Sequence, residues 1–437
     1  MAHNLRNIFC ASLIQHIKDI IYSKSFIDDN SNAPKDFTRT RKWPFPRLML
    51  FLASPRNSSM QSELSEFLDA LNQAPLEKTN DTSIFKARLK LAPSAFVDIN
   101  RKSVEFFMKE GDVKQWNGFQ LIDVDGTTLR LPNTEDVNHY FHPNVDAEGN
   151  DVGPPLARMN LLYDPLNQLC LSAELDVTGV SEINQFTHQD WQWKSGQLFL
   201  GDRHYDAFWL FAWLREKGCD FCIRLKLDTR PVVKEFLQSG LEEKVVDFTP
   251  GRSAKTRCRK RNLPTQTIKL RLIRVELPGD QVEVLATSLL DVEKIPAEQF
   301  AELYHLRWPI EEKFKQLKFR VNLENWSGKS GLSVLQDVYS RLWSTNMMVL
   351  MAHPLDSQLD ERSSRCQYDY QINWAHAIGC MKRAMVNLFF GSAVQENLER
   401  LWVRFLSALS PIRPNRKYVI NHKTYKREFY MCYKFCC

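Results

Sequence analysis

Tyr304–Lys318 reads YHLRWPIEEKFKQLK and places a phenol, a guanidinium, a carboxylate and an ammonium at steps of three, four and seven residues, at Tyr304, Arg307, Glu311 and Lys318. On an α-helix, at roughly 100° per residue, these four side chains fall within an arc of about 60°. One acid then shares a face with two cations and a hydroxyl, a set suited to binding a phosphate together with a metal ion. The alternative interpretation is a solvated charged face, which most charge-rich helices carry.

Pro309 interrupts this pattern. It has no N–H to donate to the carbonyl of His305, so the helix either restarts near Pro309 or kinks there. The shared face is then approximate for Tyr304 and Arg307, whereas we expect it to hold for Glu311 and Lys318.

Two further groups of carboxylates stand where predicted strands end. Asp123 and Asp125 lie in FQLIDVDGTTLRL, and residues two apart on a strand face the same side, so both can face one site. Asp202 follows the apolar run LFL, and acids at sheet edges lie where α/β domains usually bind ligands. Each aspartate is also compatible with a capping or turn role. With Glu311 they make three carboxylates from separated segments, a donor set that suits one Mg²⁺ or a pair of such ions roughly 3.5–4 Å apart.

The order and flanks of these residues resemble the DDE transposases of the insertion-sequence-4 group. That group shows D-G-[ST] on a strand, D-R-x-[YF] around a second aspartate, and Y-x2-R-x3-E-x6-K on a late helix. The corresponding residues here are Asp125-Gly126-Thr127, Asp202-Arg203-His204-Tyr205, and Tyr304, Arg307, Glu311 and Lys318. Further similar segments make the resemblance cover nearly the whole chain: Phe37-Thr38-Arg39, Lys42-Trp43-Pro44-Phe45-Pro46, Asn325-Trp326-Ser327-Gly328 and Pro411-Ile412-Arg413-Pro414.

The resemblance implies a transposase that binds the terminal inverted repeats of its own element, cleaves the DNA ends and joins them to target DNA. It implies that Asp125, Asp202 and Glu311 are catalytic and hold Mg²⁺, with Mn²⁺ as a substitute. Tyr304, Arg307 and Lys318 would bind the DNA. The implied partners are double-stranded element ends and target DNA, with a homodimer in the DNA complex. Asp123 is the alternative first ligand, although the D-G-T-T match favours Asp125.

The expected fold class is α/β, with an RNase H-like mixed sheet flanked by helical N- and C-terminal regions. We predict a helical DNA-binding region at 1–112, with Ser59 and Asp81 as N-cap residues, and a catalytic domain at 113–345. Within that domain we expect a hairpin across DPLN, a polar loop at 132–155 and a β-rich insertion at 228–295, in which 231–251 is strand-rich. Residues 346–437 form a helical region with a basic tail, and 333–410 reads as helical.

Composition describes an ordinary globular protein of 437 residues with a net charge of +6. Three basic clusters lie around 39–47, 252–261 and 413–427, and the first is interleaved with Phe37, Trp43 and Phe45. Basic segments mixed with aromatic residues suit contacts to phosphates and unstacked bases. No apolar run reaches the ~20 residues needed to cross a bilayer, so we expect a cytoplasmic protein without a membrane partner. Cys219 and Cys222 form a lone C-x-x-C in an apolar run, which favours buried reduced cysteines over a zinc site.

Two other functions remain open on the sequence alone. One is a catalytically silent DNA-binding protein, which would tolerate loss of any of the three acids. The other is a metal-dependent DNA nuclease that cuts without strand transfer. The retention of Asp125, Asp202 and Glu311 argues against the first alternative.

Overall fold

The computed structural model describes residues 2–39, 42–55, 58–71, 81–277 and 281–413. The chain divides into two compact units. A helical unit comprises Met1–Asp112, Thr128–Ala157 and Lys315–Cys437, and a sheet unit comprises Val113–Thr127 and Arg158–Phe314. Of the helices in the described ranges, none is long and apolar enough to cross a membrane.

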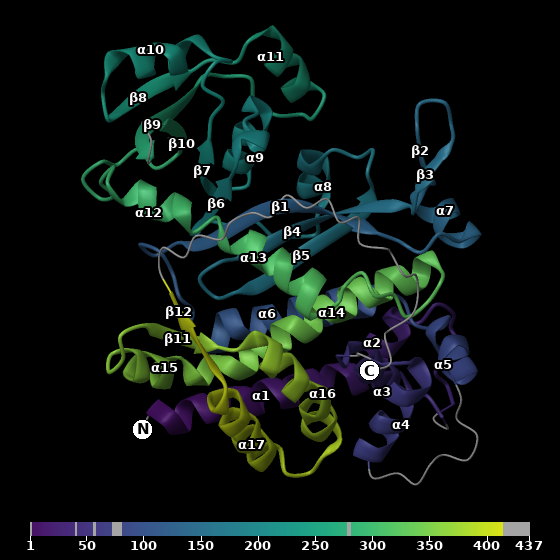
Figure 1. The fold of residues 1–437 in the computed structure, drawn as a ribbon. Helices are drawn as coiled ribbons and strands as arrows, with labels where there is room; N and C mark the ends of the chain where they lie inside the picture. Colours follow the sequence, from purple (N-terminus) through teal and green to yellow (C-terminus); the bar gives the residue numbers. More distant parts are fainter. Residues whose placement is uncertain (1, 40–41, 56–57, 72–80, 278–280, 414–437) are drawn as a thin grey trace. The chain divides into compact units, whose positions relative to one another are not determined.

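The sheet unit is built on one eight-stranded sheet with the order β5-β4-β1-β6-β7-β10-β9-β8 (Figure 1). Its strands are β1 (Gln120–Arg130), β4 (Leu156–Asp164), β5 (Leu169–Val177), β6 (Gln197–Gly201), β7 (Asp220–Arg224), β8 (Glu243–Phe248), β9 (Ile268–Leu277) and β10 (Gln281–Thr287). β1 pairs with β6, and β6 with β7, in parallel, whereas β10 is antiparallel to both β7 and β9. This mixed sheet confirms the predicted α/β class and agrees with an RNase H-like core.

Helices of the sheet unit connect its strands. They are α8 (Glu182–His188), α9 (Phe208–Glu216), α10 (Pro231–Ser239), α11 (Arg252–Arg259), α12 (Gln299–His305) and α13 (Pro309–Lys315), with a short 3-10 turn, η1 (Arg203–Tyr205). The β4–β5 hairpin confirms the predicted hairpin across DPLN, and β9 and β10 form a second, antiparallel hairpin. Cys219 and Cys222 are buried at β7, as predicted.

Part of the segment predicted to be strand-rich is helical, and that prediction was wrong. Pro231 occupies the first turn of α10, where its missing N–H costs nothing, and Gly240 ends the helix at φ 68°. Val233 and Phe236 are buried at helical spacing. Only β8 forms in the rest of this stretch, and α11 follows it.

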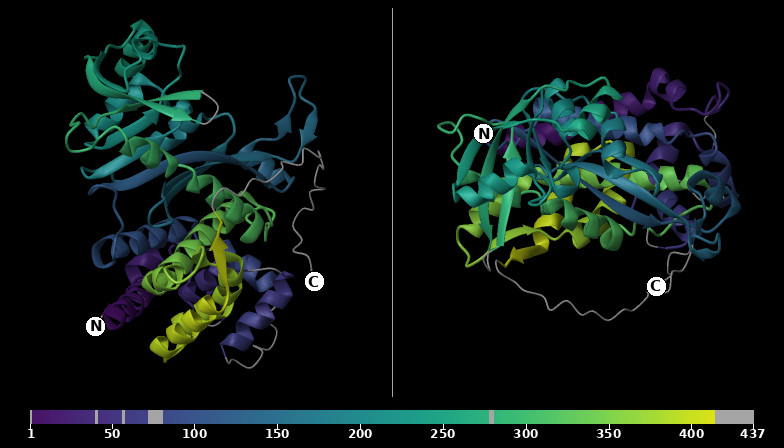
Figure 2. Two further views of the ribbon diagram at one scale, coloured as in Figure 1. Left: turned by 60° about the vertical axis from the view of Figure 1, so that its left-hand side comes forward. Right: turned by 90° about the horizontal axis from the view of Figure 1, so that it is seen from above.

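The helical unit contains α1 (Ala2–Tyr22), α2 (Lys24–Asp29), α3 (Phe45–Ala53), α4 (Met60–Ala70), α5 (Asp81–Arg88), α6 (Ser94–Glu110), α7 (Glu135–Phe141), α14 (Gly331–Ala352), α15 (Asp356–Ser363), α16 (Trp374–Phe390) and α17 (Val394–Ser407). Two short helical turns and two pairs of short strands also belong to it. The turns are η2 (Gln316–Arg320) and η3 (His353–Leu355), and the pairs are β2 (Asn144–Val145) with β3 (Asp151–Gly153) and β11 (Asp369–Ile372) with β12 (Leu409–Ile412). α14 is buried along almost its whole length and packs against α3 and α6. Figure 2 shows the N-terminal helices (purple) and the C-terminal helices (yellow) of this unit lying together.

Several predictions for this unit need correction. The stretch predicted as a polar loop contains α7 and the β2–β3 hairpin, and the stretch predicted as helical contains β11. Ser59 is confirmed as the N-cap of α4, while α5 begins at Asp81 itself. Trp43 and Phe45, which we expected beside the DNA, are buried, with the Trp43 indole donating to Ser83 Oγ at 3.0 Å. Those two rings therefore stabilise the core. The basic residues of the tail beyond 413 lie outside the described residues.

A buried polar network organises the segment Asn325–Gly328. The Trp326 indole donates to the carbonyl of Arg130 at 2.8 Å, and Ser327 Oγ donates to Asp337 at 2.6 Å. Arg88 of α5 donates to Ser327 Oγ at 2.7 Å and pairs with Asp337 at 3.2 Å. A Cβ at Gly328 would lie 2.6 Å from Ser333, so only glycine fits there. This sequence motif therefore has a structural role in the helical unit.

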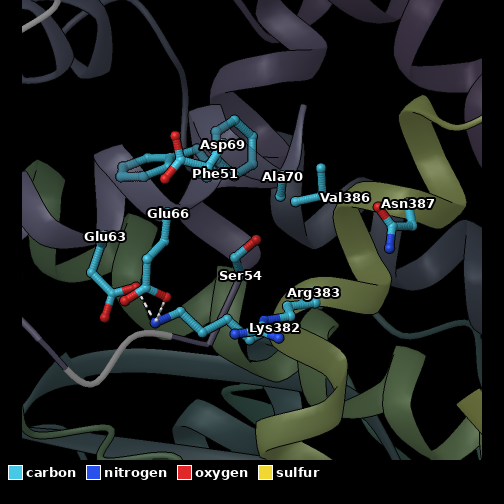
Figure 3. Close-up of a pocket in the computed structure, with 11 residues that line it drawn as sticks. Phe51, Ser54, Glu63, Glu66, Asp69, Ala70, Lys382, Arg383, Val386 and Asn387 are labelled. Atoms are coloured by element: carbon cyan, nitrogen blue, oxygen red, sulfur yellow. Dashed lines mark ion pairs between the residues drawn. The ribbon is translucent and has the colours of Figure 1, made fainter. Parts of the chain in front are cut away.

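A cavity of about 370 Å³ lies among α3, α4 and α16 of the helical unit. Figure 3 shows Lys382 reaching both Glu63 and Glu66, with N–O distances of 2.9 and 2.8 Å. Glu63 is buried and also accepts hydrogen bonds from the backbone and side chain of Ser58. These ion pairs tie α16 to α4, and none of the six site residues predicted from the sequence lines this cavity.

Candidate active site

Strand register brings the predicted aspartates together in the sheet unit. β1 and β6 are parallel, with Asp123 opposite Leu200. Two residues further along both strands, Asp125 reaches the level of Asp202, which directly follows the end of β6. Asp202 therefore stands at a strand end, as predicted, whereas Asp125 lies inside β1, which continues to Arg130. The prediction that Asp125 marks a strand end was wrong, because only the pairing with β6 ends near it.

Backbone groups orient each aspartate. Asp202 caps η1 by accepting a hydrogen bond from the His204 N–H at 2.7 Å. Asp125 Oδ1 accepts from the Gly126 N–H at 2.8 Å, and Asp123 Oδ1 accepts from the Val124 N–H at 2.8 Å. Each carboxylate thus has one oxygen fixed by the chain. The second oxygen of Asp123 is buried without a hydrogen-bond partner.

Burial of Asp123 and Asp125 disfavours the ionised form of both carboxyl groups. Desolvation raises the pKa of Asp125 to about 6, and Arg307 and the Gly126 N–H offset only part of that rise. Burial raises the pKa of Asp123 well above its usual range, and the neighbouring Asp125 and Asp202 raise it further. Raised pKa values of this kind are typical of carboxyl groups that share a site without enough positive charge beside them.

Arg307 interacts electrostatically with all of these acids of the sheet unit. Burial alone lowers the pKa of its guanidinium, but Asp123 and other nearby acidic groups, including Asp125 and Asp202, reverse this and raise it above the usual value. Arg307 Nη2 also lies 3.3 Å from Glu311 Oε1. The three aspartates and Glu311, although far apart in sequence, therefore all interact with the charge of one guanidinium.

The segment around Pro309 behaves as the sequence predicts. α12 ends at His305 and α13 begins at Pro309. The Trp308 N–H donates to the carbonyl of His305 at 3.1 Å, so that carbonyl has a partner although Pro309 cannot supply one. Glu311 falls in the first turn of α13.

After Lys315 the chain adopts a π-helical turn, η2, which the sequence pattern did not indicate. A π turn has a wider winding than an α-helix, so the seven-residue step from Glu311 to Lys318 no longer follows the α-helical period. Lys318 belongs to the helical unit, where its Nζ donates to the carbonyl of Thr128 at 2.7 Å.

Tyr304 is only 7% exposed. It packs in the cluster formed by residues such as Leu121, Leu200 and Cys222. Its ring lies 5.9 Å from the Arg307 guanidinium. The structure therefore places Tyr304 where it supports Arg307.

Two charged groups of the sheet unit, Lys313 and Glu182, were missed by the sequence analysis. Lys313 is buried, with its Nζ 5.7 Å from the ring of Tyr163 and 3.4 Å from the carbonyl of Gln168. Burial lowers the pKa of Lys313. Glu182 of α8 acts on Asp125 electrostatically. No sequence signal marks Glu182, because its position depends on the packing of α8.

Among the residues that the structure describes, no three His, Cys, Asp or Glu side chains are arranged as a ready-made metal site. Arg307 supplies positive charge near these acids. The chemistry of the donor set nevertheless fits a hard cation, because Asp125, Asp202 and Glu311 supply only carboxylate oxygens, and a backbone N–H holds one oxygen of Asp125 and one of Asp202.

A family model described as a transposase DDE domain matches residues 116–347, which is more than half of the chain. The chain belongs to the DDE transposase family. The transposase is also 22% identical over 315 residues to transposase InsG for insertion sequence element IS4 of Escherichia coli strain K12, covering 70% of this chain and 68% of InsG. This similarity agrees with the insertion-sequence-4 group. The enzyme class is accordingly a DNA transposase that cleaves DNA, transfers strands and uses a divalent metal ion.

A solved structure of the piggyBac transposase synaptic complex with hairpin DNA aligns with a TM-score of 0.44 and 11% identity. The alignment covers 90% of this transposase and 85% of the piggyBac chain.

Proposed function

We propose that Asp125, Asp202 and Glu311 are the catalytic acids of this transposase and that they hold Mg²⁺ during cleavage and joining of DNA. The observation that carries the proposal is the convergence on Arg307: strand register brings Asp125 level with Asp202, both aspartates interact electrostatically with the guanidinium, and Glu311 pairs with it. Asp125 is preferred to Asp123 as a ligand because Asp123 is fully buried.

The carboxylates of the sheet unit suit a divalent ion in two respects. They supply oxygen donors only, and burial holds Asp125 near a pKa of about 6, so added positive charge favours its ionised form. When bound, the ion activates the attacking oxygen and stabilises the leaving oxygen of the phosphodiester. One carboxylate oxygen of Asp202 and one of Asp125 accept a hydrogen bond from a backbone N–H, and this orients the second oxygen of each side chain.

Arg307 and Lys318 are proposed to hold phosphates of the DNA. Arg307 offers a planar guanidinium that can grip a phosphate with two hydrogen bonds. The ring of Tyr304, which is part of the hydrophobic core, lies against that guanidinium and supports it. Lys318 is held by the carbonyl of Thr128 and presents a compact point charge.

The proposed substrate is double-stranded DNA at the terminal inverted repeats of the element, with target DNA as the acceptor. We further propose that region 1–112 contributes to end binding and that the protein acts as a homodimer on DNA. In the sheet unit, α11 is the strongest candidate for phosphate contacts. No acidic residue occurs from Phe248 to Val275, while the segment from Arg252 to Arg261 carries six cations. Arg261 is fixed by stacking on Trp209 at 4.1 Å.

Removing cations from α11 is expected to reduce the salt dependence of DNA binding. Arg257→Ala and Arg259→Ala should each lower the log–log salt slope on duplex DNA by about 0.9 if the residue contacts one phosphate. Equilibrium binding measured across a salt series gives this slope. The control is Lys234→Ala on α10, an exposed cation outside the basic segment. Unchanged slopes in both arginine variants would exclude α11 from the DNA contacts.

Arg307→Ala is expected to destabilise the metal-free protein, because the clustered acids lose their positive neighbour. Added Mn²⁺ should then raise its melting temperature more than it raises that of the wild type, since the ion replaces the lost charge. Thermal unfolding with chelator and with Mn²⁺ measures both values. Arg307→Lys should also impair strand opening and joining, because a point charge cannot reproduce a two-pronged contact. An equal Mn²⁺ response in wild type and Arg307→Ala would contradict this account; Arg215→Ala is the exposed control.

A strand-transfer assay distinguishes the proposed function from its alternatives. The substrate is a plasmid carrying the DNA that flanks the gene, which should contain short inverted repeats. A transposase produces cut ends and joined products, a nuclease produces cut ends only, and a silent binding protein produces neither. Cutting without joining, at saturating Mg²⁺ and with both ends present, would overturn the proposal in favour of the nuclease.

A further inference from the structure

The glycine of the D-G-T segment has a specific neighbour in the sheet unit. A Cβ at Gly126 would lie 2.7 Å from both Cδ and Oε1 of Glu182. Real side chains do not approach so closely, so the Glu182 carboxylate occupies the space that a side chain at position 126 would fill. Glu182 therefore lies directly against the backbone that follows Asp125.

Glu182 also lies beside two basic side chains from other segments. Its Oε1 lies 3.7 Å from Nε of Arg158 on β4, and its Oε2 lies 3.9 Å from Nε2 of His204. His204 donates its backbone N–H to Asp202. One carboxylate thus contacts the segment that carries Asp125 on one side and the turn that carries Asp202 on the other.

We propose that Glu182 is a positioning residue of the catalytic centre, holding the Asp125–Gly126 segment and the Asp202–His204 turn in fixed relation. This inference rests on the proposed roles of Asp125 and Asp202. Removing a group that holds a metal-binding residue in position, without touching the metal itself, typically weakens metal binding by about 10–100-fold. Glu182 is 23% exposed, so its ion pairs are only partly screened by solvent.

Two variants separate the contribution of charge from that of packing. Glu182→Gln keeps the size of the side chain and removes the charge that pairs with Arg158 and faces His204. Gly126→Ala keeps the charge and displaces the carboxylate, because the far end of a glutamate can move away from the new methyl group. If Glu182 positions the site, both variants should weaken Mn²⁺ binding by about 10-fold or more.

The test is isothermal titration of the full-length protein with Mn²⁺ alone, with thermal unfolding in chelator to confirm an intact fold. Glu216→Gln, which removes an exposed acid from the end of α9, is the matched control and should bind Mn²⁺ like the wild type. Wild-type Mn²⁺ affinity in both Glu182→Gln and Gly126→Ala would overturn the inference. Asp125→Ala and Asp202→Ala are titrated in parallel: wild-type affinity in these two variants would overturn the proposed metal site itself.

Discussion

Replacing Asp125, Asp202 or Glu311 by the corresponding amide should reduce DNA cleavage by about a thousandfold or more. Each substitution keeps the shape of the side chain and removes one negative oxygen donor. Loss of several kcal/mol of charge stabilisation in the transition state corresponds to this factor, at about 1.4 kcal/mol per tenfold in rate. Cleavage is measured on labelled element ends with Mg²⁺ in excess.

The binding of element ends by the same three variants should stay within a few-fold of the wild type, because the acids do not attract phosphate. Asp228→Asn, which changes an exposed aspartate of the sheet unit, serves as the control. Near-normal cleavage by any one of the three variants would remove that acid from the site. For Asp125, such a result together with loss of cleavage in Asp123→Asn would transfer the role to Asp123.

Breaking the buried pair between Arg88 and Asp337 should give the largest loss of stability in the helical unit. Both side chains are almost fully buried, and Arg88 donates to Gln336, Ser327 and the carbonyl of Ser333 as well. Removing one partner of a buried pair costs about 3–5 kcal/mol, because a charge is left without compensation. Arg88→Ala should therefore lower the melting temperature on the order of 10 °C.

The matched control for this prediction is Arg101→Ala. Arg101 pairs with Asp98 within the same unit, but both side chains are 32% exposed. A pair of that kind contributes about 0–1 kcal/mol, so the melting temperature should change little. Thermal unfolding followed by circular dichroism compares the two variants. Equal, small shifts would show that the Arg88 network does not hold the segment after η2.

The parts of the site that follow from local pattern could be predicted from the sequence. Alternation along β1 placed Asp123 and Asp125 on one face, and the apolar run of β6 placed Asp202 at its end. The missing N–H of Pro309 predicted the break between α12 and α13. The helix α10 was also predictable, since Pro231 and Gly240 are ordinary start and stop signals; the strand-like residues that follow it led to the error.

Features that depend on contacts between distant segments could not be predicted in this way. The position of Glu182 against Gly126 arises from packing of α8, and the burial of Trp43 arises from its contact with α5. β10 joins the central sheet beside β7, although more than 50 residues separate them in the chain. The π turn of η2 has no residue signature, so the step from Glu311 to Lys318 looked regular.

The most direct test of the central claim is to locate Mn²⁺ by its anomalous scattering in crystals of the transposase with its element ends. The account predicts an anomalous peak within coordination distance of carboxylate oxygens from Asp125, Asp202 and Glu311, and no such peak at Glu216 on α9. A Mn²⁺ peak that none of these three acids contacts, in crystals that remain competent for cleavage, would contradict it.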